Sequence, residues 1–197
     1  MKKFIDWHFY NVNFISIIVL ILSLIWIKLC NISIIYENSI YENIAVIPLT
    51  IGIILCLKQK NHKVLFRMIA MVLFLAIARE FSYGRVPFAV MPDNPHNYYS
   101  WSHYKYGWIA HVVIGVYIAA GFLYGIINKF WNDIVAIVKK VPLPVWSFVL
   151  TLGFIAVQMY DEKVLETSMI EEVMELSIYC MCAAIVYIYC KNLQKDN

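Results

Sequence analysis

The chain has 197 residues, of which 62% are hydrophobic and 15% charged, and its formal net charge at pH 7 is +3. Its mean hydropathy of +0.69 excludes an ordinary water-soluble globular domain. Its small, scattered positive charge excludes nucleic acid as an expected partner. We therefore predict a single all-α domain over residues 1–197, a polytopic helix bundle whose surroundings are a lipid bilayer.

The first predicted membrane span is an unbroken apolar run over residues 14–30. It follows the basic pair Lys2-Lys3 and an aromatic, polar patch around Trp7, which is typical of a membrane-interface anchor. The run is too long for the apolar core of a signal peptide, and no small-x-small cleavage site follows it. We expect it to be retained as a transmembrane helix.

Five further apolar runs predict five more spans, over residues 44–57, 64–81, 107–127, 143–160 and 170–190. The second run is short for the roughly 20 residues that a span needs, so we expect its helix to extend into the flanking polar residues. It also contains Pro48, which favours a kink. The pattern predicts about six transmembrane helices.

Basic residues alternate with acidic or mixed loops along the chain. They gather near the N-terminus, at residues 58–67, at residues 129–140 and near the C-terminus. By the positive-inside rule, these four regions lie in the cytoplasm. The charge pattern therefore predicts six spans with both termini cytoplasmic, and a basic loop between the fourth and fifth spans.

Ionisable side chains lie at one depth on three of the predicted spans. Glu80 ends the third span, His111 lies one turn into the fourth, and Glu175 lies near the start of the sixth. At about 1.5 Å per residue, all three lie near the outer face. His111 is four residues from Gly107 and from Gly115, so we expect it to face a closely packed neighbour. We predict that Glu80, His111 and Glu175 converge as catalytic acid and base groups.

Carboxylates on the sixth span require a neutralising partner. Glu172 and Glu175 share one helix face at i, i+3 spacing, and like charges in a partly desolvated site repel each other. With His111 they are candidate ligands of a divalent metal, the one cofactor that we consider. If no metal is bound, we expect Arg79 or Arg85 to pair with them, because a guanidinium can hold two carboxylates.

The loop over residues 86–106 joins the third and fourth spans and is rich in proline and aromatic residues. Such a loop forms an aromatic belt at the membrane interface, or alternatively a lid that brings His103 towards Glu80. If the protein is an enzyme, Arg79, Arg85 and His103 are candidate substrate-binding residues, and Arg79 or Arg85 would hold a phosphate or carboxylate of a lipid head group.

The segment from Ala78 to Arg85, Ala-Arg-Glu-Phe-Ser-Tyr-Gly-Arg, resembles a pattern of small bacterial integral membrane proteins of unassigned function. In these proteins a Glu-Glu-x-x-Glu-like stretch also opens a late span, as Glu-Glu-Val-Met-Glu does here over residues 171–175. Arg79 and Arg85 stand where Glu and Gln are more usual in that pattern. The resemblance implies a bacterial inner membrane protein and brings no activity with it.

A looser likeness, in architecture only, is to ceramidase-like membrane hydrolases, whose site combines Ser, Asp and His around zinc. Ser82, Asp161, His103 and His111 are the matching residue types. The paired histidines at helical spacing that the family carries are absent from the sequence.

Two functional classes remain open. The first is a membrane-embedded hydrolase or transferase that acts at the outer leaflet on a lipid or lipid-linked substrate. The second is a non-catalytic membrane subunit, whose polar cluster locks helices together or receives a membrane protein partner. The G-x-x-x-G of Gly121 and Gly125 would serve helix packing in either class.

Overall fold

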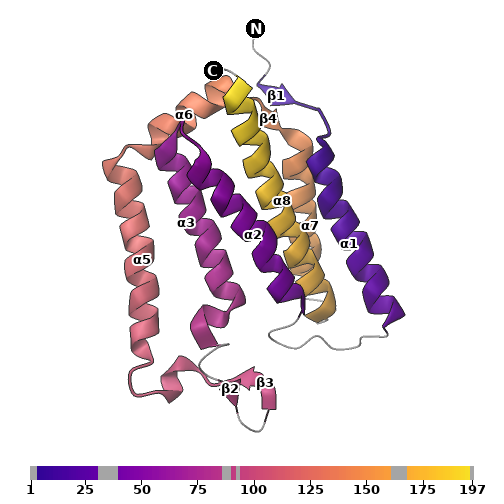
Figure 1. Ribbon diagram of the computed structural model, residues 1–197, viewed down its shortest axis with the longest axis vertical. Helices are drawn as coiled ribbons and strands as arrows, with labels where there is room; N and C mark the ends of the chain where they lie inside the picture. Colours follow the sequence, from indigo (N-terminus) through magenta and orange to yellow (C-terminus); the bar gives the residue numbers. More distant parts are fainter. Residues whose placement is uncertain (1–3, 31–39, 86–89, 92–93, 161–167, 196–197) are drawn as a thin grey trace.

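The computed structural model describes residues 4–30, 40–85, 90–91, 94–160 and 168–195. Seven α-helices account for most of them (Figure 1). Much of the polar loop after the first span and the acidic segment 161–167, which includes Asp161, lie outside the described residues, as do residues 86–89 and 92–93 of the proline-rich loop.

The helices are α1 (Asn11–Leu29), α2 (Ile40–Lys58), α3 (Lys63–Glu80), α5 (Trp108–Ile127), α6 (Phe130–Lys140), α7 (Val145–Tyr160) and α8 (Ser168–Lys195). Two 3-10 turns are η1 (Ser82–Gly84) and η2 (Trp101–His103), and four short strands are β1 (Ile5–Asp6), β2 (Val90–Met91), β3 (Asn94–Tyr98) and β4 (Leu143–Pro144). Strand β1 pairs in parallel with β4, and β2 pairs antiparallel with β3. The all-α prediction is confirmed, since the strands among the described residues form two small ladders.

Each predicted apolar run corresponds to one helix. The second run extends at both ends into polar residues, as expected, and α2 continues through the buried Pro48. Within the described residues, α1, α2, α5 and α8 are long and apolar enough to cross a membrane, and α7 is a shorter apolar helix. These helices indicate an integral membrane protein.

Helix α6 corrects the prediction of a basic loop over residues 129–140. Phe130, Ile134 and Ile137 recur at helical spacing, and Ile137 is buried. The Asp133 carboxylate lies 3.0 Å from His62 Nδ1 and accepts a hydrogen bond of 3.3 Å from the backbone N–H of Leu65 in the first turn of α3. A carboxylate from α6 thus caps the N-terminus of α3, where backbone donors lack partners within their own helix.

Helix α8 is the centre of the bundle. It packs against α1, α2 and α7, and α2 packs in turn against α3 (Figure 1). In the apolar part of α8, 61% of the residues are buried, against 11% in α5. Helix α5 is accordingly peripheral, and most of its apolar surface faces outward.

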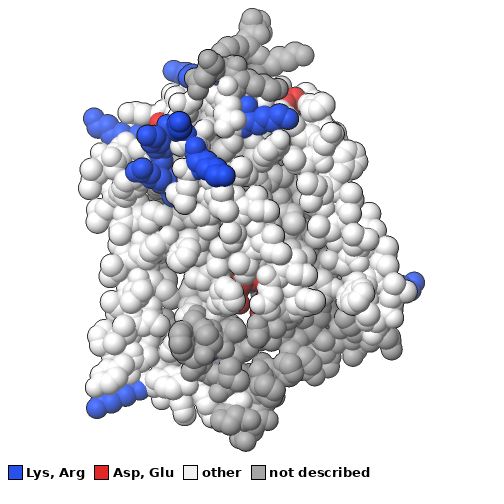
Figure 2. Space-filling model, viewed as in Figure 1, with Lys and Arg blue, Asp and Glu red and all other residues white. Residues whose placement is uncertain are grey.

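The two ends of the bundle differ in charge. Both chain termini lie at one end, together with α6 and the β1–β4 pair, and the β2–β3 hairpin lies at the other (Figure 1). On the face drawn in Figure 2, most Lys and Arg side chains gather at the end that carries the termini. The same end holds the basic region 58–67 and the second basic region around α6. We refer to it as the basic end.

Candidate functional site

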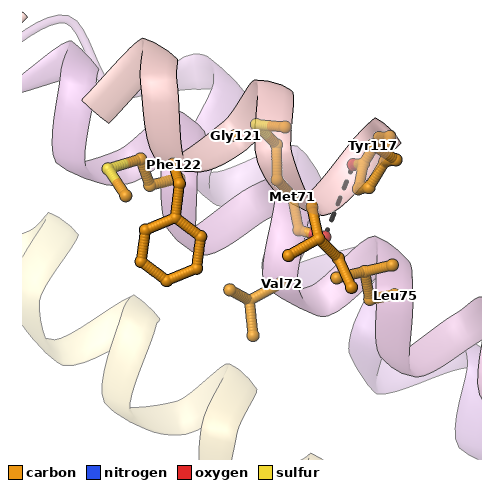
Figure 3. A pocket seen from close by; sticks show the side chains of 8 residues that line it. Met71, Val72, Leu75, Tyr117, Gly121 and Phe122 are labelled. Atoms are coloured by element: carbon orange, nitrogen blue, oxygen red, sulfur yellow. Dashed lines mark hydrogen bonds between the residues drawn. The ribbon is translucent and has the colours of Figure 1, made fainter. Parts of the chain in front are cut away.

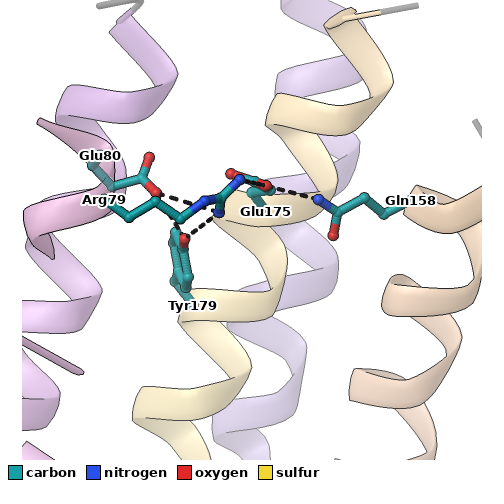
Figure 4. A network of polar contacts seen from close by, with 5 residues as sticks. All are labelled: Arg79, Glu80, Gln158, Glu175 and Tyr179. Atoms are coloured by element: carbon teal, nitrogen blue, oxygen red, sulfur yellow. Dashed lines mark hydrogen bonds and ion pairs between the residues drawn. The ribbon is translucent and has the colours of Figure 1, made fainter. Parts of the chain in front are cut away.

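An ionic network joins α3, α7 and α8 (Figure 4). It lies where α3 ends, away from the basic end of the bundle (Figure 1). Arg79 Nη2 lies 2.5 Å from Glu175 Oε1 and forms an ion pair with it. Gln158 Nε2 donates a hydrogen bond of 2.7 Å to the same oxygen. One carboxylate of α8 is therefore held from both sides, by a cation of α3 and by an amide of α7.

Tyr179 connects this pair to a second carboxylate. Its hydroxyl accepts a hydrogen bond of 3.1 Å from Arg79 Nη1 and donates one of 2.7 Å to Glu80 Oε1. Arg79 Nη1 also lies 3.8 Å from that Glu80 oxygen. The order of contacts is therefore Glu175, Arg79, Tyr179 and Glu80, and each member touches the next.

Helical spacing explains why these side chains meet. Glu175 and Tyr179 are four residues apart on α8, so they lie on one face, one turn after the other. Arg79 and Glu80 are the last two residues of α3, where the chain leaves the helix and long side chains can turn towards a neighbour. Gln158 lies in the last turn of α7, at the same level.

The two carboxylates of the network are buried, so they would destabilise the fold if they were not paired. Glu80 and Glu175 are 6% and 7% exposed, whereas the Arg79 side chain is 50% exposed. A buried carboxylate requires hydrogen bonds and a nearby positive charge. Arg79 supplies one positive charge for both buried carboxylates, so the network carries an excess of negative charge when both are ionised.

A third carboxylate adds to this excess. Glu172 is half-buried on the same end of α8 and lies close enough to Glu80 and Glu175 to interact with them electrostatically, as it does with Glu42 and Glu171. Among the described residues, no group of three or more His, Cys, Asp and Glu side chains is arranged to hold a metal ion. The acidic groups are gathered here, but they do not form a coordination shell.

The structure brings together some of the residues that we singled out from the sequence. Glu80, Glu175 and Arg79 are in one network, with Glu172 beside it, and the predicted pairing of an arginine with the carboxylates of the sixth span is confirmed for Arg79. Arg85 is half-buried at the end of η1 and makes no ion pair with another described residue.

Two of the histidines that we singled out from the sequence, His111 and His103, are not part of the network. His111 is exposed on α5, which corrects the prediction that it faces a packed neighbour and converges with Glu80 and Glu175. The glycine next on its face, Gly115, also has no atom within 4 Å of the place of a side chain. His103 is exposed in η2, and its ring stacks on that of Tyr99 with 4.4 Å between centroids.

Sequence reasoning missed two members of the network, Tyr179 and Gln158. The signal for Tyr179 was its i+4 spacing from Glu175, which places both on one helix face. The signal for Gln158 was a polar side chain inside the apolar run 143–160. Both residues supply neutral hydrogen-bond donors to a carboxylate.

A second polar group lies at the basic end. The Tyr10 hydroxyl donates a hydrogen bond of 2.5 Å to Asp6 Oδ2 and accepts one of 3.3 Å from Asn192 Nδ2. Burial, together with the hydrogen bond to Asp6, raises the pKa of Tyr10. These residues border a cavity of about 470 Å³, which His8 and Lys191 also line. The group ties the N-terminal segment to the end of α8.

These features define an α-helical integral membrane protein with a buried ionic network across three helices. Compared with protein-family models, with curated protein sequences and with solved structures, the chain gives no significant match.

Proposed function

We propose that the chain crosses the membrane six times and has both termini in the cytoplasm of a bacterial cell. Helices α3 and α7 have 18 and 16 residues, or about 27 and 24 Å, which approaches the roughly 30 Å of a bilayer core. They run beside the four longer apolar helices (Figure 1). The gathering of Lys and Arg at the end with both termini supports this orientation. In the proposed orientation the ionic network would lie near the outer leaflet.

We further propose that the network is the acid–base site of an enzyme that acts on a lipid or lipid-linked substrate in that leaflet. The observation that carries this proposal is that two buried carboxylates, Glu80 and Glu175, share one guanidinium. With one cation for two carboxylates, the site carries an excess of negative charge that a proton or another cation would offset. A carboxyl pair that keeps one proton can give it to a substrate at one oxygen and take one at another.

The contacts favour different roles for the two arginines. The guanidinium of Arg79 is engaged by Glu175 and Tyr179, so we assign it to holding the carboxylates rather than to binding substrate. Arg85 follows the same helix end without such an engagement and remains the candidate for a head-group phosphate. Figure 2 shows acidic atoms at the surface, between neutral ones, in the half of the drawn face away from the basic end. This exposure supports access of a lipid substrate to acidic groups from the membrane.

The test is a lipidomic comparison of cells that lack the protein with cells that carry the wild type, Glu80→Gln or Glu175→Gln. We expect one lipid class to change in the deletion and in both variants, because each substitution removes a carboxylate that can exchange a proton. Asp133→Asn is the matched control, since it removes a carboxylate at the basic end. Size-exclusion chromatography of each purified variant establishes that it is folded. Metal analysis of the wild type tests whether a divalent cation at Glu172 and Glu175 adds to the positive charge of Arg79.

Folded variants that restore the wild-type lipid profile would count against the enzyme. One observation then favours the second candidate function, a non-catalytic membrane subunit: the contacts of Arg79 with Glu175 and of Glu175 with Gln158 each join different helices. For such a subunit, Glu175→Gln lowers the stability of the bundle and leaves the lipid composition unchanged.

A further inference from the structure

Helix α5 contacts the bundle along a narrow stripe. It packs on α3, where the side chains of Met71 and Met68 lie over Gly121 and Gly125. A Cβ atom at Gly121 would be 2.8 Å from Met71 Cε. Because contact is confined to this stripe, an apolar groove is left on each side. Figure 3 shows the smaller one, about 130 Å³, with Tyr117 and Gly121 on one wall.

The larger groove, about 390 Å³, lies between α2, α3 and α5. Its α2 wall is formed by Ile53 and Leu57, and Phe74 of α3 lies at its far end from the basic region. On the α5 side it is bordered by Tyr117 and Tyr124. The Phe74 and Tyr117 rings meet with 5.7 Å between their centroids, so aromatic side chains close the groove towards the middle of the bundle.

The other end of this groove carries a cation. Arg67 Nη1 donates a hydrogen bond of 3.1 Å to the Tyr124 hydroxyl, and Arg67 is exposed. Because that hydroxyl accepts from Arg67, its own proton is left to donate to another acceptor. Lys63 lies one turn before Arg67 on the same helix face, and Lys58 follows Leu57 directly; both are exposed.

The charge at this end is uncompensated within the groove. The side chains that line it include no Asp or Glu, and α5 has no acidic residue along its length. Figure 2 shows Lys and Arg side chains gathered over the basic ends of the helices on this face. From Arg67 to Phe74 the distance along α3 is seven residues, about 10 Å. The groove therefore presents a cation at the membrane surface and an apolar channel that leads inward.

We propose that this groove binds an anionic phospholipid of the leaflet at the basic end. The lipid phosphate accepts hydrogen bonds from Arg67 and Tyr124, and one acyl chain lies along Leu57, Ile53 and Phe74. Basic pockets between membrane helices bind anionic head groups in this way. A second copy of the chain is a poorer occupant, because its α5 brings no carboxylate and would leave the Arg67 guanidinium unpaired in an apolar contact. The site is separate from the Glu80 network, and its test does not depend on the proposed reaction.

The experiment measures lipid binding to the detergent-purified protein by native mass spectrometry. The probes are phosphatidylglycerol and phosphatidylcholine with identical acyl chains. We expect the wild type to bind phosphatidylglycerol about tenfold more tightly, because both lipids carry the phosphate but only phosphatidylcholine carries a trimethylammonium group, which Arg67 repels. Arg67→Gln abolishes this preference, and Tyr124→Phe weakens the binding of both lipids, since each carries the phosphate that the hydroxyl would contact. Lys28→Gln is the matched control. It removes an exposed cation in the last turn of α1, at the end of the bundle away from the groove's cation, and leaves the preference intact.

A further variant, Ile53→Trp, fills the apolar part of the groove and weakens the binding of both lipids while Arg67 remains. Equal affinity of the wild type for the two lipids would overturn the proposal. So would a Lys28→Gln protein that loses the preference as Arg67→Gln does, because the effect would then be one of overall charge. Unchanged phosphatidylglycerol binding by both Tyr124→Phe and Ile53→Trp, or a stable dimer that excludes lipid from this face, would also overturn it.

Discussion

Replacing Arg79 with Met is the sharpest test of the ionic network. The substitution removes the guanidinium that joins α3 to α8 and keeps an unbranched apolar stem of similar reach. It leaves Glu175 with the Gln158 amide and Glu80 with the Tyr179 hydroxyl as hydrogen-bond donors. Two buried carboxylates then lack the cation that they share in the wild type.

The magnitude follows from the burial of the two partners. Breaking a fully buried ion pair costs about 3–5 kcal/mol, whereas an exposed pair contributes less than about 1 kcal/mol. The side chains of Glu175 and Arg79 are 8% and 50% exposed, so the pair lies between these limits. We expect Arg79→Met to lower the free energy of unfolding by about 2 kcal/mol.

The assay is equilibrium unfolding in mixed detergent micelles, combined with a double-mutant cycle that includes Glu175→Gln. We expect a coupling energy of about 1–2 kcal/mol between the two positions, because they are in direct contact. Arg85→Met is the matched control, with an expected change within about 0.5 kcal/mol.

If Arg79→Met has the same free energy of unfolding as the wild type, this reasoning is refuted. The carboxylates would then be hydrated in the folded protein, and the contacts of Arg79 would have no energetic role. The reasoning is also refuted if Arg85→Met loses as much unfolding free energy as Arg79→Met. The loss would then depend on the number of cations and not on the Arg79–Glu175 pair.

Two other predictions test the packing and the topology. Gly121→Leu should destabilise the protein by about 1–3 kcal/mol, because the side chain enters the space of Met71, whereas Gly115→Leu should be tolerated since nothing lies within 4 Å there; thermal unfolding of both variants in detergent measures the difference. Reporter fusions at Asn61 and Asn94 should report opposite sides of the membrane, and the six-span topology is wrong if both report the same side.

Much of the helical arrangement was predictable because apolar length and charge act independently of packing. A run of apolar residues forms a helix in lipid whatever its neighbours are. Helix α6 was missed because its basic residues, Lys139 and Lys140, were interpreted only as a topology signal. Its apolar residues, which include Phe130, Ile134 and Ile137, already recur with the period of an amphipathic helix.

The ionic network was predictable in part because depth and charge follow from the sequence. The rotation of a helix about its axis does not, and this decided the outcome for His111. Gly121 is six residues after Gly115, so at about 100° per residue the two lie about 120° apart around α5. Packing of Met71 on the Gly121 face leaves His111 and Gly115 on an outward face. The sequence offered two faces with small residues, and only the partner helix determines which is used.

The central position of α8 determines when the other helices can pack together during biosynthesis. Helices α1, α2 and α7 all pack on α8, which the ribosome makes after them, so these contacts form only once the intervening helices have been inserted. Helix α1 waits longest, and it is suited to this: it has the highest hydropathy of the four long apolar helices, and only 17% of the residues in its apolar span are buried. A chain that stops before α8 therefore leaves apolar helices in the bilayer without a core, together with an Arg79 whose carboxylate partner on α8 is missing, and quality-control proteases can recognise such an unassembled state.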